Sequence, residues 1–325
     1  MRRPRAPGAG DGEPVIPFFD TGAVEAALDY PRLIEALRDA FAAGDIEAPV
    51  RTAHEVGTPD SPGRLLAMPA WRRGDGVGVK LVNVFPGNAA RGLGAVHAVY
   101  VLFDGETGAP RAMIDGEALT NRRTAAASAL ASRYLSRPDS AVLTLVGTGH
   151  LGPALAHAHG VVRPIRRILV WGRTAAKAEA LAARLRGERL PAEAAADLPA
   201  AVAAADIVSC ATTSTEALVR GRDVRPGTHV DLVGAFTPAM RESDDALIRA
   251  ARVYVDTRDG ALQEAGDLTQ PIAAGTWSAD RLAGDLRDLC GGAGEGRRSA
   301  DEITVFKSVG ASLEDLVAAS LVVGA

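Results

Sequence analysis

The chain has 325 residues, of which 47% are hydrophobic and 23% charged, and its formal net charge at pH 7 is −4. That composition is typical of a soluble globular protein, and the length predicts two domains. The negative charge argues against nucleic acid as a general partner. Two cysteines, Cys210 and Cys290, are too few for a disulfide framework, which favours a reducing, cytoplasmic setting. No apolar run reaches the roughly 18 residues of a membrane span, so we expect no membrane anchor.

Residues 1–136 predict a leader, two helices and a sheet. The leader, residues 1–13, is basic but lacks the apolar core of a signal peptide, so we expect it to be disordered. One helix starts at Asp20 or Thr21, and Pro31 begins a second that Gly44 ends. The pattern then changes to that of hairpins, which predicts a largely antiparallel sheet. Its expected strands cover residues 50–56, 64–71, 77–84, 97–103 and 111–114.

A long helix over residues 116–135 leads into a second, α/β domain, and Pro138 and Asp139 mark the boundary. The alternation of strands and helices that follows predicts a parallel sheet. Segments 211–222 and 234–245 follow strand ends, where ligands bind in such sheets. An apolar strand and helix between residues 303 and 323 are expected to return to the first domain.

The strongest motif is a glycine pattern at the start of the second domain. The run from Val142 to Val146 is followed by Gly147, Gly149 and Gly152, then by a helix and a second apolar run. In a βαβ unit such glycines provide a tight turn, close approach of the backbone to a pyrophosphate and close helix–strand packing. The free N–H groups at the helix start face the phosphate charge, so the motif predicts a dinucleotide site.

The end of the second strand of this unit indicates which dinucleotide binds. It reads Gly172-Arg173-Thr174, with Lys177 one turn later and no carboxylate before Glu179. An acidic residue there would favour NAD, whereas arginine accommodates the 2′-phosphate of NADP. These cations could equally be ordinary solvated surface residues. Their place beside the glycine pattern favours NADPH, with NADH as the alternative.

Three cations lie among apolar or small residues of the first domain. Lys80 interrupts an apolar strand, Arg51 precedes another, and Arg123 lies in a helix rich in alanine. A buried lysine is costly unless it is paired, and burial lowers its pKa towards the range useful for proton transfer. The alternative is a lysine that reaches solvent or pairs with a carboxylate elsewhere. His97 fits an ordinary strand histidine, and no cluster of metal ligands or serine-hydrolase motif is present.

Together these residues carry a family resemblance that covers almost the whole chain. The matching stretches include RLLAMPAW (64–71), GVKLVNVFPGNAARGL (78–93), AVHAVYVLFDGETGAP (95–110), DGEALTNRRTAAASALA (115–131), VGTGHLG (146–152), VGAFTPAMRESD (233–244), VYVDTRDGALQEAGDL (253–268) and ITVFKSVG (303–310). They resemble the ornithine cyclodeaminase/μ-crystallin family. The resemblance implies an α+β substrate and dimerisation domain (14–136, completed by a C-terminal helix, 311–325), a Rossmann-type NAD(P) domain (137–310) and a homodimer.

The resemblance also implies roles for individual residues. Arg51, Lys80 and Arg123 match the residues that bind the substrate carboxylate and line the reacting centre, with His97 a second candidate for proton transfer. The positions that match cofactor contacts are Gly147, Thr148, Gly149, His150, Gly152, Arg173, Thr174, Lys177, Ala211, Thr212, Val233 and Lys307. Phe236 and Met68 are expected to form an apolar wall against the substrate ring.

One departure from the family pattern decides the expected reaction. Cyclodeaminases carry an aspartate base two residues after the equivalent of Gly234, and here that position is Phe236, which accepts no proton. Asp231, inside the preceding strand, is not expected to replace it. The segment is similar to the branch that reduces Δ1-pyrroline-2-carboxylate and Δ1-piperideine-2-carboxylate, so we expect a ketimine reductase. The alternatives are a cyclodeaminase or alanine dehydrogenase of the same fold, and a non-catalytic NADPH-binding protein.

Overall fold

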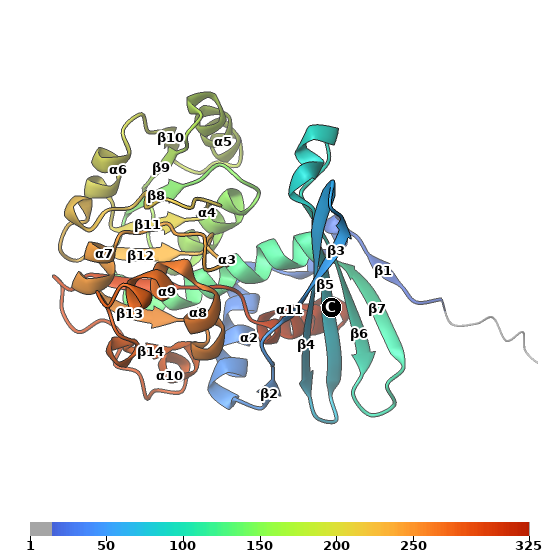
Figure 1. Cartoon of the computed structure of the whole chain (residues 1–325). Helices are drawn as coiled ribbons and strands as arrows, with labels where there is room; N and C mark the ends of the chain where they lie inside the picture. The colour runs from blue at the N-terminus through green and yellow to red at the C-terminus, as the bar shows by residue number, and fades with distance from the viewer. Residues whose placement is uncertain (1–14, 325) are drawn as a thin grey trace, which may run out of the picture.

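The computed structural model describes residues 15–324, so the predicted disordered leader lies outside the described residues. Two lobes are visible in Figure 1, each built on one sheet, and the long helix α3 (Gly116–Leu135) crosses between them. Strands of residues 18–115 form one sheet, and strands of residues 142–307 form the other. The α/β class and the two-sheet organisation predicted from the sequence are therefore confirmed.

The first sheet has the order β1-β7-β6-β5-β4-β2. Strand β2 pairs with the last two residues of β4 (71–72), and β3 pairs with residues 61–67 of the same strand. Its strands are β1 (Phe18–Phe19), β2 (Ile46–Glu47), β3 (Thr52–Thr58), β4 (Ser61–Arg72), β5 (Gly76–Val84), β6 (Val96–Asp104) and β7 (Pro110–Asp115). All pairings are antiparallel except that of β1 with β7. The expectation of a largely antiparallel sheet is correct, and the added edge strand makes the sheet mixed.

Helices cover one face of this sheet. They are α1 (Thr21–Ala27), α2 (Tyr30–Ala43), α3 and the C-terminal helix α11 (Ser312–Val323), and a 3₁₀ helix, η1 (Pro86–Arg91), joins β5 to β6. Because side chains alternate along a strand, Lys80 and Tyr100 point into the protein, whereas Val79 and Val101 point away from it. Helix α11 packs on β4, β5 and α3, so the chain returns to the first lobe as expected.

The second sheet is wholly parallel, in the order β10-β9-β8-β11-β12-β15-β13-β14. Its strands are β8 (Val142–Val146), β9 (Arg167–Trp171), β10 (Ala192–Ala194), β11 (Ile207–Cys210), β12 (His229–Leu232), β13 (Arg252–Val255), β14 (Gly284–Asp285) and β15 (Thr304–Lys307). Its helices are α4 (Leu151–Val162), α5 (Ala175–Gly187), α6 (Leu198–Ala204), α7 (Asp245–Ala250), α8 (Arg258–Glu264), α9 (Gly266–Ala273) and α10 (Leu286–Cys290), with 3₁₀ turns η2 (Gly221–Asp223) and η3 (Ala279–Arg281). None of the described helices is long and apolar enough to span a bilayer.

Helix α3 joins the lobes through a buried polar contact. Asp231 of β12 is fully buried and accepts hydrogen bonds from Ser128 of α3 (3.0 Å) and Ser209 of β11 (2.6 Å). Nε2 of His159, on α4, lies 3.4 Å from the same carboxylate. Asp231 therefore ties four elements together.

Replacing Asp231 with alanine is expected to lower the free energy of unfolding by about 2–4 kcal/mol, because it leaves buried hydroxyl donors without an acceptor. Urea unfolding followed by circular dichroism measures the change. Asp139→Ala is the matched control: its side chain is 82% exposed, and its removal is expected to change stability by less than about 0.5 kcal/mol. Equal effects of the two substitutions would contradict this role of Asp231.

Candidate functional site

The glycine turn after β8 has the geometry of a dinucleotide loop. Gly147 has a φ of +121°, and a Cβ built on it would lie 2.5 Å from the carbonyl oxygen of Ala211, so a side chain is excluded. A Cβ on Gly149 would meet no atom within 4 Å, which leaves open space before the start of α4. His150, the N-cap of α4, makes no side-chain capping bond. Gly152 donates its N–H to the carbonyl oxygen of Gly149, and Pro153 has no N–H. The N–H groups of His150 and Leu151 at the start of α4 thus remain for an anion, and the turn fits a pyrophosphate.

The third glycine of the motif has a packing role that differs in detail from the expected one. A Cβ on Gly152 would lie 3.0 Å from Cδ2 of Leu181, so this glycine allows α4 to approach helix α5 rather than a strand. At the end of β9, a Cβ on Gly172 would lie 2.6 Å from Cγ2 of Thr148. The segment that follows β9, with Arg173, Thr174 and Lys177, therefore begins directly beside the glycine turn, and all three residues are exposed.

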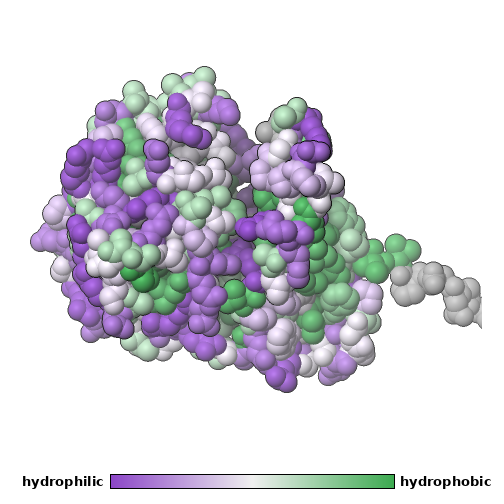
Figure 2. Space-filling view, in the orientation of Figure 1, coloured by the Kyte–Doolittle hydropathy of each residue, from purple (hydrophilic) through white to green (hydrophobic). Residues whose placement is uncertain are grey.

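A cavity of about 380 Å³ lies between the two lobes and includes the start of α4. Figure 2 shows that the molecule is hollowed between its two upper parts. The cavity brings together many residues that the sequence singled out: Arg51, Met68, Lys80, Arg123, Gly149, His150, Ala211, Thr212, Val233 and Phe236. Aliphatic side chains of β4, β5 and β6, including Val82 and Ala98, complete its wall. A ligand in this cavity would thus contact cations from the first lobe and loops from the second.

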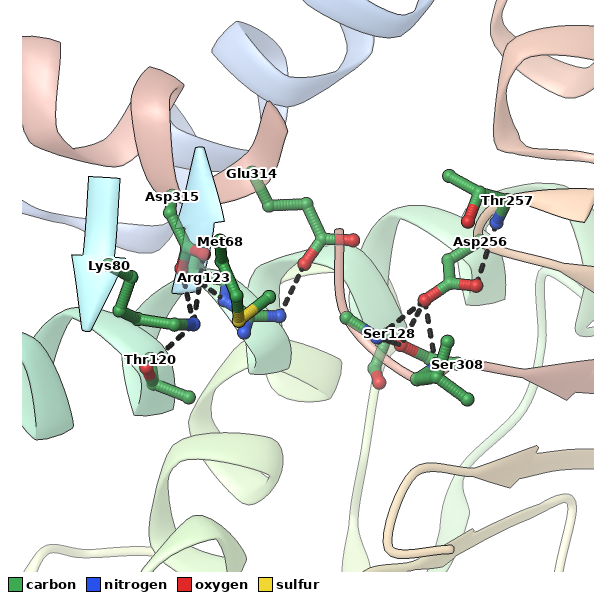
Figure 3. A network of polar contacts seen from close by, with 12 residues as sticks. Met68, Lys80, Thr120, Arg123, Ser128, Asp256, Thr257, Ser308, Glu314 and Asp315 are labelled. Carbon is green, nitrogen blue, oxygen red and sulfur yellow. Dashed lines mark hydrogen bonds and ion pairs between the residues drawn. The ribbon is translucent and has the colours of Figure 1, made fainter. Parts of the chain in front are cut away.

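Two of the three cations share one carboxylate. Nζ of Lys80 lies 2.9 Å from the carboxylate of Asp315 and 3.2 Å from Oγ1 of Thr120, while Nε of Arg123 donates to Asp315 at 2.8 Å. Nη1 of Arg123 donates to Glu314 at 2.7 Å. Figure 3 shows Lys80 and Arg123 converging on Asp315 from β5 and α3. Within residues 15–324, Nη2 of Arg123 has no hydrogen-bond partner, so it can bind a further anion.

Burial changes the proton affinities of this cluster. Removal from water, together with the neighbouring charge of Arg123, lowers the pKa of Lys80 to about 8, against the opposing effect of Asp315. Burial likewise raises the pKa of Glu314 to about 7, although Arg123 opposes the shift. Lys80 can therefore exchange its proton near neutral pH, which is the requirement for a general acid.

Arg51, from the first lobe, reaches across the cavity edge to the second lobe. Its Nη2 donates to Glu264 of α8 at 2.8 Å and to the carbonyl oxygen of Val309 at 2.7 Å. The loop that carries Val309 is itself fixed by Asp256, which lies beside Ser308 in Figure 3. Asp256 accepts hydrogen bonds from the Ser308 hydroxyl and from the N–H groups of Val309 and Gly310. Nη1 of Arg51 meets only the sulfur of Met68, at 4.0 Å, so it has no oxygen acceptor among the described residues.

Two expected site residues lie elsewhere. His97 is exposed, and the alternation of β6 places it on the face opposite to Val96 and Ala98, which line the cavity. Lys307 is fully buried beneath the strand ends, 3.3 Å from Asp267, so the expected direct contact with a cofactor does not fit its place. In both cases the direction of the side chain depends on the fold, which a sequence motif does not specify.

The residues that pair with the cations were not identified from the sequence. Glu314 and Asp315 are an acidic pair at the start of an otherwise apolar C-terminal helix, and this contrast with the rest of the helix was an available signal. No feature of the sequence pointed to Glu264 or Thr120, because their partners, Arg51 and Lys80, lie far from them in the chain. Among residues 15–324 no group of three or more His, Cys, Asp or Glu residues is arranged to hold a metal ion.

Comparison with known proteins identifies relatives over nearly the whole length of this chain. Residues 21–324 match the model of the ornithine cyclodeaminase/mu-crystallin family. A Δ1-pyrroline-2-carboxylate reductase of Paracoccus denitrificans is 41% identical over 306 residues, which cover 94% of this chain and 95% of the relative.

Solved structures with the same fold are known. The Thermococcus litoralis Δ1-pyrroline-2-carboxylate reductase in complex with NADH and L-proline superposes with a TM-score of 0.91 and 31% identity, over 95% of this chain and 97% of that one. An archaeal alanine dehydrogenase dimer with bound NAD gives a TM-score of 0.87 and 26% identity, over 95% of each chain.

Proposed function

Because the chain belongs to the ornithine cyclodeaminase/μ-crystallin family, we propose that it is an NAD(P)H-dependent ketimine reductase. Its substrates are Δ1-pyrroline-2-carboxylate, Δ1-piperideine-2-carboxylate or both, and its products are L-proline and L-pipecolate. The observation that carries the proposal is one cavity in which Arg51, Lys80 and Arg123 stand opposite the loops of the glycine turn. Such a site binds a small carboxylate in front of a dinucleotide.

The two arginines bind and orient the substrate carboxylate. Nη2 of Arg123 and Nη1 of Arg51 are the donors that protein oxygens do not use, and guanidinium groups bind carboxylates through paired, directional hydrogen bonds. Phe236 and Met68 supply apolar surface for the ring. Holding the two reactants in line contributes up to roughly 7–11 kcal/mol to lowering the barrier.

The reduction adds a hydride to the imine carbon and a proton to the imine nitrogen. Bound NAD(P)H supplies the hydride. Lys80 holds the proton on Nζ, and its pKa of about 8 leaves it mostly protonated at neutral pH but able to release the proton. Asp315 and Thr120 keep Nζ in place before and after the transfer. His97 has no part in this mechanism, because it lies on the other face of β6.

Cyclodeamination is disfavoured by the residue at position 236. Phe236 lines the cavity where that reaction needs a carboxylate base towards the substrate amine. A non-catalytic binding protein is disfavoured by Lys80, because a dinucleotide or hormone carrier has no need for a buried lysine with a lowered pKa. Imine reduction therefore accounts for both Phe236 and Lys80, whereas each of the other two functions fails to account for one of them.

The proposed cofactor is NADPH, with NADH as a weaker alternative. Arg173 and Lys177 are exposed beside the glycine turn, and within residues 15–324 neither forms an ion pair. A 2′-phosphate placed there would gain two cationic contacts without displacing a carboxylate. The similar structures named above hold NADH or NAD, which supports retention of some activity with NADH.

The proposed assembly is a homodimer formed through the outer face of the first sheet. This face carries Val77, Val79, Val99, Val101 and Met113, of which Val77 and Met113 are each 38% exposed. Figure 2 shows hydrophobic residues gathered on the side where β5 to β7 lie. A second copy of the same face would cover this apolar surface with twofold symmetry. The proposed location is the cytoplasm, where a reducing environment preserves the free thiols of the two cysteines.

Lys80→Met tests the proton donor. We expect kcat/KM for pyrroline-2-carboxylate to fall by about 10²–10⁴-fold, because the substitution keeps the length of the side chain but removes the proton. NADPH affinity, measured by fluorescence titration, is expected to change less than about twofold. In the unmodified protein kcat/KM should decrease as pH rises through about 8, the pKa of Lys80, since only its protonated form donates.

The control for this experiment is Arg32→Met, which removes an exposed cation of α2 and should leave turnover unchanged. The proposed role of Lys80 would be refuted if Lys80→Met turned over the imine as fast as the unmodified protein. It would also be refuted if kcat/KM of Lys80→Met still decreased above pH 8.

Arg173→Glu tests the choice of dinucleotide. The new carboxylate would repel the 2′-phosphate and could accept a hydrogen bond from a ribose 2′-hydroxyl. We expect the KM for NADPH to rise at least about tenfold and the KM for NADH to change less than about threefold. Arg166→Glu, an equal charge reversal at the opposite end of β9, serves as the control. Equal changes for both dinucleotides would show that Arg173 does not contact the 2′-phosphate.

Val101→Asp tests the dimer. A charge in the centre of the outer sheet face should convert the protein from dimer to monomer, because an interface cannot bury an unpaired carboxylate without a large penalty. Light scattering coupled to size-exclusion chromatography measures the mass. Val161→Asp on the exposed side of α4 is the control and should not alter the mass. A Val101→Asp variant that stays dimeric would place the interface elsewhere.

A further inference from the structure

Two loops at the carboxyl ends of β11 and β12 form the wall of the cavity on the side of the second lobe. Loop A is residues 211–213 and loop B is residues 233–236. Their backbones are in direct contact: a Cβ built on Gly234 would lie 2.0 Å from the carbonyl oxygen of Thr212. A shift of one loop would therefore move the other, and both contribute to the surface beside the glycine turn.

One buried carboxylate, that of Glu242, holds both loops. Its Oε1 accepts hydrogen bonds from the N–H (2.6 Å) and the hydroxyl (2.9 Å) of Thr212 in loop A. Its Oε2 accepts from the N–H groups of Gly234 (2.8 Å) and Ala235 (3.3 Å) in loop B. The side chain is fully buried and does not line the cavity. Each oxygen thus serves one loop, and the carboxylate sets the distance between them.

The position of Glu242 is itself fixed from behind. Asp267, at the start of α9, accepts hydrogen bonds from the N–H groups of Glu242 and Ser243 and from the Ser243 hydroxyl, each at 2.8 Å. Nζ of Lys307, on β15, lies 3.3 Å from Asp267 and 3.9 Å from Glu242. Lys307, expected from the sequence to touch the cofactor, is instead the counter-ion of the two buried carboxylates.

We propose that Glu242 is a positioning residue for the dinucleotide: by holding loops A and B together it preorganises the surface on which the cofactor lies. The inference rests on the proposed function, because it concerns the same site. A buried carboxylate with four donors is rigid, and rigid loops need no ordering when the ligand binds. Lys307 and Asp267 act through Glu242, and neither needs to contact the cofactor.

Glu242→Gln tests the inference. The amide has one acceptor oxygen, and its NH₂ group would face the N–H donors of one loop, so that loop is released. We expect the Kd for NADPH, measured by fluorescence titration well below the thermal midpoint of the variant, to rise at least about tenfold. The KM for the imine at saturating NADPH should change less than about threefold. In the dinucleotide-free protein, amide hydrogen exchange should become faster in loop A or loop B.

Glu216→Gln is the matched control, because it makes the same change at an exposed residue shortly after loop A and should alter none of these values. Thr212→Val and Thr212→Ser provide a second pair if Glu242→Gln does not fold. The valine variant loses the hydroxyl bond to Glu242 and should bind NADPH several-fold more weakly, whereas the serine variant restores this bond and should recover most of the lost affinity.

The pH profile of binding separates a positioning role from a purely structural one. The groups that face Glu242 are Lys307 on β15, Asp267 on α9 and Cys210 on β11, and burial raises the pKa of Glu242 to about 7. Protonation removes acceptor capacity for the loops, so the Kd of the unmodified protein should rise as pH falls through about 7. Glu242→Gln should lack this dependence.

The outcomes distinguish the two proposals. If Glu242→Gln and Thr212→Val bind NADPH as the unmodified protein does, the positioning role is overturned. It is also overturned if Glu242→Gln lowers the stability of the protein while the Kd for NADPH stays constant. If the unmodified protein binds neither NADPH nor NADH, the proposed function fails as well. A rise in Kd with faster loop exchange and a lost pH dependence supports the role.

Discussion

The site depends on the neutralisation of buried cations by the last helix of the chain. Lys80 and Arg123 are almost entirely removed from water, and each would be costly to bury alone. Asp315 and Glu314, from the first turn of α11, supply the opposite charges at 2.7–2.9 Å. Because α11 is separated from β5 by more than two hundred residues, the charges of Lys80 and Arg123 are neutralised only when the C-terminal helix has docked on the first sheet.

The same arrangement explains how cations can be both buried and available. The carboxylates of α11 use Nε and Nη1 of Arg123 but leave Nη2 without a protein partner among residues 15–324. Arg51 is held in a similar way by Glu264 and Val309, which belong to elements from the second half of the chain. Protein carboxylates thus hold the cations in place and leave guanidinium N–H groups that can donate to the carboxylate of the proposed substrate.

Carboxylates also order the second lobe at three separate places. Asp231 ties α3 to the parallel sheet, Asp256 fixes the loop that bonds to Arg51, and Glu242 holds the two loops at the strand ends. Each accepts hydrogen bonds from several backbone or hydroxyl donors that secondary structure leaves unpaired. Loops at the carboxyl ends of parallel strands are long and irregular, and this buried polar bonding gives them a defined shape.

The sequence by itself determined the class of fold, the element order, the glycine turn and the family, because these depend on local periodicity and on short motifs. Helix 116–135 and the longer strands of both sheets were predicted within a few residues for this reason, whereas the short strands β1, β2, β10 and β14 were not predicted. The partners of Lys80, Arg123 and Arg51, the direction of His97 and the buried place of Lys307 were decided only by the tertiary structure. They depend on contacts between residues far apart in the chain and on which face of a strand meets a helix, and no local pattern contains either.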